Sequence, residues 1–220
     1  MNRTALVLGS VAVLAGTFAA GAFMYRNEES QQAAIPAAGP SPDRLAALER
    51  ADAQRLGDPA AKVTIVEFFD PACETCAEFA PYMKALVDRH PGKVQIVYRY
   101  APLHPGSDQV SAMLEAARKQ DKYFEALEIM FSTQATWASH HAPNPDALWG
   151  LLEQGGLDIV KLRTDMVDPA IAAAVAEDVK DGRTLGVKAT PEFFVNGKPL
   201  PKWGMRQLTE LVQAELAANY

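Results

Sequence analysis

The two cysteines of this 220-residue chain, Cys73 and Cys76, are separated by only two residues. They follow an apolar run at 63–69 and a turn at Pro71, and the segment after them has helical periodicity. Residues three apart on a helix share a face, so the two sulfur atoms can meet. Cys73 lies at the expected helix N-terminus, where free N–H groups and the helix dipole favour the reactive thiolate. The spacing therefore predicts a redox dithiol in which the pKa of Cys73 is lowered.

Two other uses of the cysteine pair are a structural disulfide and a metal site. A disulfide across two residues closes a very small loop and constrains the unfolded chain little. A zinc site needs three or four ligands, and the chain has no second cysteine pair. His140 and His141 are neighbours that point in different directions on any regular element, and a copper site there is a weaker alternative. We predict no metal and no other cofactor.

The first 25 residues are typical of a targeting or anchoring segment. Arg3 precedes an uncharged stretch at 4–25 that is rich in Ala, Val, Leu and Gly. This length is close to the roughly 20 residues that span a bilayer, although residues 20–22 also offer a small-residue cleavage site. A cleaved signal peptide and an inner-membrane anchor therefore both stay open. Either one places the remaining chain in the periplasm or another extracytoplasmic compartment, where a dithiol can cycle.

The order of apolar segments in the first half of the chain predicts an α/β core. Residues 26–42 are polar and then Pro/Ala/Gly-rich, as in a flexible linker. Residues 43–104 begin with a short helix expected over 44–55. They continue with a buried strand at 63–69, a helix at 73–89 and a second strand at 94–100.

The second half of the chain begins with a long helical segment at 105–184. Strand character returns in 185–220, which complete the core with a strand at 192–195, an Asn-Gly hairpin turn, a short edge strand and a helix at 205–217. We expect a mixed central sheet flanked by helices and interrupted by an all-helical insertion. The helices expected in the insertion lie at 107–119, 121–133, 145–154, 158–166 and 169–182.

Glu67 is an ionisable residue in an otherwise apolar strand. It lies six residues before Cys73. Burial raises the pKa of a carboxyl group, and such a group can relay protons to the second cysteine during exchange. The alternative is a shallower strand in which Glu67 meets solvent.

A second informative segment lies at 186–197. Pro191 directly precedes a β-run, and a proline at that place in a mixed sheet needs a reason. A cis Thr190–Pro191 bond turns the chain sharply and leaves the backbone groups of Thr190 free near the dithiol. Those groups can pair with an extended substrate segment. The alternative is a trans proline at the start of a strand.

The two segments, their order and the helices between them resemble the DsbA-like branch of the thioredoxin superfamily. The resemblance covers about residues 56–220, is specific at 67–76 and 186–197, and extends to 97–104. It implies a thioredoxin-like core split by a helical domain and an exported enzyme of thiol–disulfide exchange. The roles it implies are the nucleophile for Cys73, the resolving cysteine for Cys76, the buried acid for Glu67 and the residue before the cis-proline for Thr190.

The residues between the cysteines depart from that family. Its strongly oxidising members carry Pro-His there, whereas this chain has Glu74 and Thr75. A carboxylate repels the thiolate and makes the reduced form less favourable, so we expect a reduction potential below the roughly −120 mV of DsbA. A weaker expectation is that His140, in the segment 136–145, tunes the thiolate or touches substrate. The alternative is a solvated loop with Trp137 packed beneath it.

We therefore expect a protein thiol–disulfide oxidoreductase that acts on exported proteins with thiols or disulfides. A membrane redox partner would set the direction, and oxidase, isomerase and reductase all stay open. Two alternatives are a redox-inert chaperone or adaptor of the thioredoxin fold and a dedicated reductant of a maturation pathway. A net charge of −6 without a basic stripe argues against nucleic acid as a partner. Contact with a membrane is expected only through residues 4–25.

Overall fold

The structure is a computed structural model that describes residues 41–138 and 143–220. The predicted signal peptide or anchor at 1–25, and all but the end of the predicted linker, lie outside the described residues. Within the described part of the chain, no helix has both the length and the apolar character needed to span a bilayer.

Five strands form one mixed sheet in the order β1-β3-β2-β4-β5. Strands β2 and β3 are parallel at its centre, and each of the other pairs is antiparallel. Every residue of β2 and β3 is buried, as near-continuous apolar runs predict for strands covered on both faces. The bounds are Gln54–Gly57 for β1, Val63–Phe69 for β2, Val94–Tyr100 for β3, Glu192–Val195 for β4 and Lys198–Pro199 for β5.

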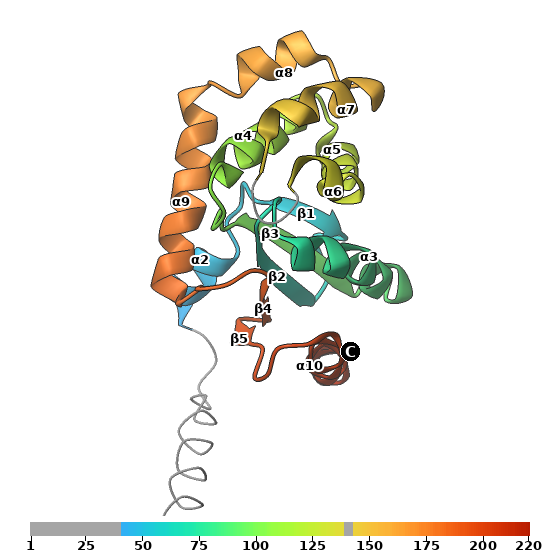
Figure 1. Ribbon diagram of the computed structural model, residues 1–220. Helices are drawn as coiled ribbons and strands as arrows, with labels where there is room; N and C mark the ends of the chain where they lie inside the picture. The colour runs from blue at the N-terminus through green and yellow to red at the C-terminus, as the bar shows by residue number, and fades with distance from the viewer. Residues whose placement is uncertain (1–40, 139–142) are drawn as a thin grey trace, which may run out of the picture. The chain divides into compact units, whose positions relative to one another are not determined.

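Helices cover both faces of the sheet. Helices α3 (Glu74–Arg89) and α10 (Met205–Asn219) pack on one face, and α2 (Pro42–Leu48) and α9 (Pro169–Leu185) pack on the other (Figure 1). The side chains of β2 alternate between the two apolar cores formed in this way. The predicted mixed sheet flanked by helices is confirmed.

The chain between β3 and β4 is helical, as predicted. A short 3-10 turn at Pro145–Ala147 precedes α7, and α6 is a single turn that the sequence pattern did not indicate. Trp137 at the end of α6 is buried, and its Nε1 donates to the Met130 carbonyl oxygen at 2.8 Å, so it packs as the alternative interpretation expected. The remaining helices are α4 (Ser107–Arg118), α5 (Tyr123–Ser132), α6 (Gln134–Trp137), α7 (Leu148–Gln154) and α8 (Ile159–Asp165).

The helix predicted over 44–55 is wrong in its second half. Helix α2 ends at Leu48, and residues 54–57 form strand β1 against β3. Pairing with the β3 edge satisfies backbone groups that a longer helix would leave exposed, and it overrides the local helical pattern. Gly57 allows this close approach, because a Cβ atom there would lie 2.7 Å from the Val94 carbonyl oxygen.

A buried arginine joins β3 to the helices on the far face. Arg99 is fully buried, and its Nε and one terminal nitrogen each donate to a carboxylate oxygen at 2.8 Å, on Asp178 and Asp181 of α9. The other terminal nitrogen donates to the Leu48 carbonyl oxygen at 2.8 Å. Removing one partner of such a buried pair leaves a charge uncompensated. The contact fixes the C-terminal part of α9, which leads to Gly186 and the second segment of the site.

Candidate active site

Cys73 and Cys76 lie where strand β2 passes into helix α3. The Cys73 N–H donates to the Asp70 carbonyl oxygen at 3.0 Å, which closes the turn after the strand. Cys73 is the N-cap residue of α3, with an extended backbone, and Cys76 is in the first turn. Cys73 keeps 6% of its surface exposed, whereas Cys76 is fully buried. Both are free thiols, so the two cysteines differ chiefly in their access to solvent.

The second predicted segment meets the first. Helix α9 ends at Leu185 and is capped by Gly186, whose φ of 85° is a left-handed conformation that favours glycine. The chain then reaches the Thr190–Pro191 peptide bond, which is cis. The Thr190 carbonyl oxygen accepts a hydrogen bond from the Cys73 Sγ at 3.3 Å. Two segments 117 residues apart therefore share one site.

The pKa of Cys73 is lowered to about 5, and the largest cause is a hydrogen bond from the Cys76 thiol. Burial acts in the opposite direction, and hydrogen bonds from Thr190 and from the N–H groups of Thr75 and Cys76 add to the lowering. Those N–H groups belong to the start of α3, so the predicted effect of the helix N-terminus is present but is not the main one. A pKa of about 5 favours the Cys73 thiolate at neutral pH, and the hydrogen bond to the Thr190 carbonyl oxygen belongs to the protonated thiol.

The pKa values of Cys76 and Glu67 are raised, whereas that of Cys73 is lowered. Burial raises the pKa of the Cys76 thiol well above its ordinary value, and its hydrogen bond to Cys73 and the nearby Glu67 carboxyl raise it further. Glu67 is 2% exposed, so the predicted burial is confirmed. Burial, followed by repulsion from Cys73, raises the pKa of the Glu67 carboxyl to about 8. A carboxyl with that pKa can both accept and release a proton near neutral pH.

A buried carboxylate that sequence reasoning missed supports the turn before the cysteines. Asp70 is fully buried, and its Oδ1 accepts from the Ala72 N–H at 2.8 Å. Its Oδ2 accepts from the Leu103 N–H at 2.7 Å and from the Ser107 hydroxyl at 3.0 Å, and it lies 2.7 Å from His104 Nδ1. The proline after Asp70 indicated only a turn, and the likeness at 97–104 gave these residues no role.

Aromatic side chains form an apolar surface beside the cis-proline. Trp203 is 56% exposed, and its Nε1 donates to the Pro191 carbonyl oxygen at 3.4 Å. Its ring centroid lies 5.2 Å from that of Phe79 on α3, which in turn packs on Phe193 of β4 at 5.2 Å. Sequence reasoning missed Trp203, because its neighbours are distant in the chain.

The remaining predicted site residues lie in the first turn of α3 or outside the described part of the chain. Glu74 is exposed in the first turn of α3, and Thr75 is half-buried beside it. His140 and His141 lie outside the described residues, so their predicted roles stay predictions. Within residues 41–138 and 143–220, no group of three or more His, Cys, Asp or Glu side chains is placed to hold a metal ion.

The curated proteins that match this chain are longer than it, and the match covers one part of each. The chain is 29% identical over 155 residues to a Na(+)/H(+) antiporter NhaA of Herminiimonas arsenicoxydans. The matched region covers 70% of this chain and 24% of that protein. The chain thus spans about a quarter of the length of the curated relatives it matches.

Comparison with solved structures gives the fold. A thioredoxin-like oxidoreductase from Silicibacter pomeroyi DSS-3 matches with a TM-score of 0.68 and 27% identity, over 82% of this chain and 100% of that one. Alpha-DsbA1 of Wolbachia pipientis matches with a TM-score of 0.68 and 20% identity, over 80% of this chain and 96% of that one. A family model described as thioredoxin matches residues 50–214. The chain belongs to the thioredoxin family, and its helical segment between β3 and β4 gives it the DsbA-like form of that fold.

Proposed function

We propose that the chain exchanges disulfide bonds with the cysteines of other proteins through Cys73 and Cys76. The observation that carries the proposal is the position of Cys73, an N-cap thiol that keeps some exposure and contacts the Thr190 carbonyl oxygen at 3.3 Å. A thiolate is the attacking species in thiol–disulfide exchange, and a low pKa also makes it a good leaving group. The lowered pKa of Cys73 suits both tasks.

In the oxidising direction, a client thiolate attacks Cys73 in the Cys73–Cys76 disulfide. A client–Cys73 bond forms, the Cys73–Cys76 bond breaks, and Cys76 leaves as a thiolate that takes up a proton. A second client thiolate then attacks the client sulfur of the mixed disulfide. The client disulfide forms, Cys73 leaves as a thiolate, and two electrons have passed from client to protein.

In the reducing direction, the Cys73 thiolate attacks a client disulfide and forms the mixed disulfide. Cys76 must then lose its proton to attack Cys73 and release the client. Its raised pKa makes the thiol a poor nucleophile unless a base accepts that proton. Glu67 has the position and the pKa for that role, and we assign it there.

The loop at Thr190 and Pro191 gives a place for the client backbone. A client segment bound to Cys73 would lie along this loop in an extended form, as in strand addition. The exposed ring of Trp203 beside Pro191 provides apolar contact for client side chains. Exported proteins with thiols or disulfides are the substrates that this arrangement suits.

We also propose that the protein works outside the cytoplasm with a membrane redox partner. The support is the apolar segment at 4–25, typical of a signal or anchor, and the need of a cycling dithiol for an electron donor or acceptor. The antiport activity of the curated relatives belongs to those proteins.

Insulin reduction, together with the refolding of a reduced disulfide-containing protein, tests the proposal. We expect activity in at least one assay for the wild type and its complete loss in Cys73→Ala. Glu78→Ala, at an exposed position of the same helix, is the matched control and should keep the activity. Equal rates in wild type and Cys73→Ala would contradict the proposal and would favour the redox-inert chaperone or adaptor.

A further inference from the structure

Two polar side chains on the adjacent central strands have no hydrogen-bond partner among residues 41–138 and 143–220. Glu67 of β2 and Tyr98 of β3 are opposite each other in the parallel register. Within residues 41–138 and 143–220, no side-chain oxygen or nitrogen that is closed off from solvent lacks a hydrogen-bond partner. The Glu67 carboxyl and the Tyr98 hydroxyl make no hydrogen bond to these residues, although the residues are only 2% and 7% exposed. Solvent therefore reaches both groups through a narrow route.

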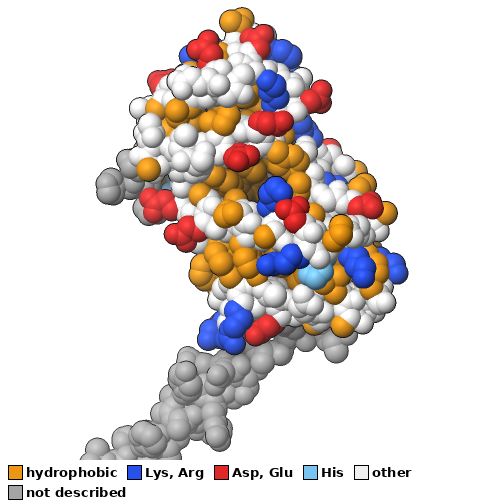
Figure 2. All heavy atoms as spheres, turned by 90° about the vertical axis from the view of Figure 1, so that its right-hand side faces the viewer, with side chains coloured by type: hydrophobic (Ala, Val, Ile, Leu, Met, Phe, Trp, Pro, Cys, Tyr) orange, Lys and Arg blue, Asp and Glu red, His pale blue; other side chains and the backbone are white. Residues whose placement is uncertain are grey.

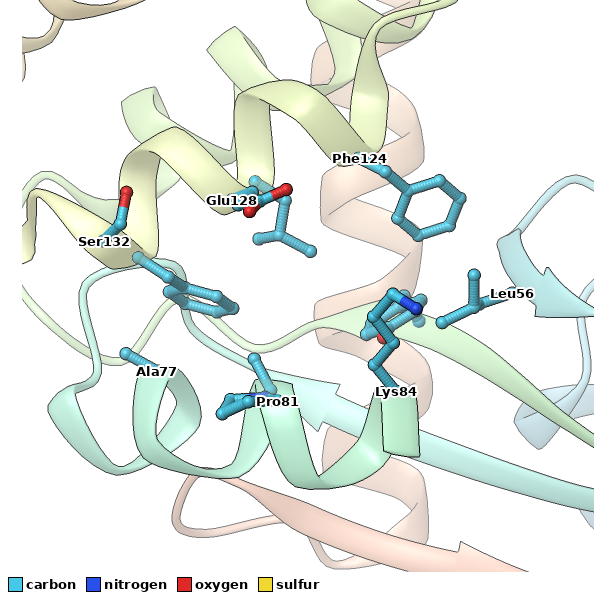
Figure 3. Close-up of a pocket in the computed structure, with 11 residues that line it drawn as sticks. Leu56, Ala77, Pro81, Lys84, Phe124, Glu128 and Ser132 are labelled. Atoms are coloured by element: carbon cyan, nitrogen blue, oxygen red, sulfur yellow. The ribbon is translucent and has the colours of Figure 1, made fainter. Parts of the chain in front are cut away.

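A cavity of about 430 Å³ reaches Tyr98, and Tyr98 separates it from Glu67, which is not in its lining. It opens on the molecular face shown in Figure 2, where hydrophobic side chains line a hollow with charged groups at its edge. Helices α3 and α5 form its sides, with Ala77 and Pro81 on α3 opposite Ser132 and Glu128 on α5, and Lys84 opposite Phe124 (Figure 3). Tyr98 of β3 belongs to its lining. We call this space the α3–α5 cavity.

Small side chains on the α3 side leave this cavity open. Ala77 directly follows Cys76, and Ala80 lies one turn further along the same flank of the helix. Larger side chains at these positions would extend toward α5 and fill the space. Tyr98 also lines a second opening beside Gln54, but its volume of about 10 Å³ is at the limit for one water molecule. The α3–α5 cavity is therefore the only one of these two openings that admits a chain of water molecules.

The reaction needs such a route. When Cys76 resolves a mixed disulfide, its proton passes to the Glu67 carboxylate, and the carboxylic acid is left in the interior. Because the pKa of Glu67 is raised to about 8, its carboxyl is mostly protonated at pH 7, so a proton must leave it for bulk water before it can accept the Cys76 proton, in the first turnover as in each later one. Proton transfer needs contact at hydrogen-bond distance, directly or through water.

We propose that the α3–α5 cavity is the proton exit of this site and that Tyr98 is the positioning residue that links Glu67 to it. The inference rests on the proposed function and deepens it. The proton of Glu67 passes through a water molecule between the two groups to the Tyr98 oxygen, as the Tyr98 hydroxyl proton passes to water in the cavity. Tyr98 is thus neutral before and after the step, and no other reactant is consumed.

Stopped-flow reaction with glutathione disulfide separates the two halves of the chemistry. The reduced protein first forms the Cys73–glutathione mixed disulfide, and Cys76 then releases the second glutathione. Rapid acid quench with intact-mass measurement follows each species. We expect Tyr98→Phe and Ala80→Leu each to slow the second step about tenfold at pH 7, which is less than a full loss of general base catalysis. The first step should stay within about twofold of the wild type, because a route beneath Cys76 does not serve it.

Two matched variants control for packing. Tyr123→Phe removes a hydroxyl from a buried tyrosine that does not line the cavity, and Ala85→Leu adds the same side chain to α3 away from it. Neither should slow the second step. Imidazole buffer, which can enter an open cavity, should restore the second step in Tyr98→Phe but not in Ala80→Leu. Ala80→Val replaces Ala80→Leu if thermal unfolding shows that the larger side chain prevents folding.

One set of results would contradict the proposed function, and a different set would contradict only the proton exit. A wild-type protein that forms no mixed disulfide would contradict the proposed function itself. A normal first step with an unchanged second step in either Tyr98→Phe or the Ala80 variant would overturn the proton exit alone. Equal slowing in the control variants would overturn it as well.

Discussion

The two flanks of helix α3 differ in what they offer to the same pair of cysteines. On the flank toward β4 and α10, Cys73 meets the Thr190 carbonyl oxygen, and Trp203 exposes an aromatic ring beside the cis-proline. On the flank toward α5, Cys76 is covered, and Glu67 lies beside Tyr98, which lines the α3–α5 cavity. We call these the client flank and the proton flank.

The difference explains how one short turn supports two chemically distinct tasks. The hydrogen bond from Cys76, followed by those from Thr190 and the start of α3, lowers the pKa of Cys73, so this thiol is ready to attack or to leave. The proton flank raises the pKa of Cys76, so this thiol keeps its proton until a base removes it. Two residues lie between the cysteines, and their environments differ because Cys73 is the N-cap whereas Cys76 points into the core. The following predictions test this difference.

The largest expected difference is in the pH dependence of alkylation. The pKa of Cys73 is lowered to about 5, so its reaction with iodoacetamide should rise to a plateau with a midpoint near pH 5. Cys76 should stay unmodified below pH 9, because its pKa is raised and its sulfur is buried. Mass spectrometry of the digested protein reads both sites. In Cys76→Ala the midpoint should move upward, because the largest cause of the lowering is gone, and an unmoved midpoint would contradict that cause.

Glu67→Gln should stabilise the reduced protein in a pH-dependent way. The pKa of Glu67 is raised from about 4.5 to about 8 in the folded state. A raised carboxyl pKa contributes stability that is fully present below pH 4.5 and is lost as the pH rises to 8. The variant lacks this loss, so its free energy of unfolding should equal that of the wild type near pH 4 and exceed it by about 4 kcal/mol at pH 7.5.

Urea unfolding of the reduced protein at the two pH values measures this gain. Glu78→Gln, which removes an exposed carboxyl from α3, serves as the control and should change stability by less than about 0.5 kcal/mol at both. A gain of the same size at pH 4 and pH 7.5 would show that Glu67 does not titrate in this range.

Trp203→Ala should weaken the client flank alone. Its ring packs on Phe79 and exposes an apolar surface beside Pro191, and contacts of this kind contribute about 0.5–1.5 kcal/mol. We expect KM for insulin to rise several-fold, while the rate with glutathione disulfide, which is too small to reach the ring, stays unchanged. Trp149→Ala, at a tryptophan that packs on Arg163, is the control. A parallel loss with both substrates would mean that Trp203 supports the fold of the loop rather than client binding.

Glu74→His should have the smallest effect. An exposed carboxylate beside Cys73 disfavours the thiolate, and a histidine there favours it, so the reduced form gains stability and the potential rises. Exposed charge pairs contribute at most about 1 kcal/mol, which corresponds to about 20 mV for a two-electron couple. Equilibration with glutathione compares the variant with Glu78→His one turn further along. A fall in potential, or an equal rise in both variants, would contradict the role of Glu74.

The sequence predicted the two cysteines, Glu67 and the cis-proline segment, but it missed Trp203 on the client flank and Tyr98 on the proton flank. The strand at 63–69, the helix after the cysteines and the strand at 94–100 have strong apolar periodicity, and Glu67 is conspicuous as a carboxyl in an apolar run. Tyr98, in contrast, is one aromatic β-former among several in its strand. Its position opposite Glu67 follows only from the register of β2 and β3.

Contacts between distant segments explain the remaining errors. Strand β1 has one apolar side chain, Leu56, in four residues, so only its pairing with β3 identifies it. Asp70 acquires its partners from Leu103 to Ser107, and Trp203 acquires its position from Pro191 and Phe79. Local patterns carry no information on such pairs. A helix or strand can be predicted from its own period, whereas a buried carboxylate is explained only by the donors that the fold brings to it.

A redox titration of the wild-type protein in glutathione buffers tests the central claim most directly, with thiol alkylation and intact mass as the readout. We predict one transition that removes two hydrogens between a Cys73–Cys76 dithiol and its disulfide, with a midpoint between about −270 and −120 mV. A protein that stays in one state across this range, or that forms only a glutathione adduct at Cys73, would contradict exchange through this pair.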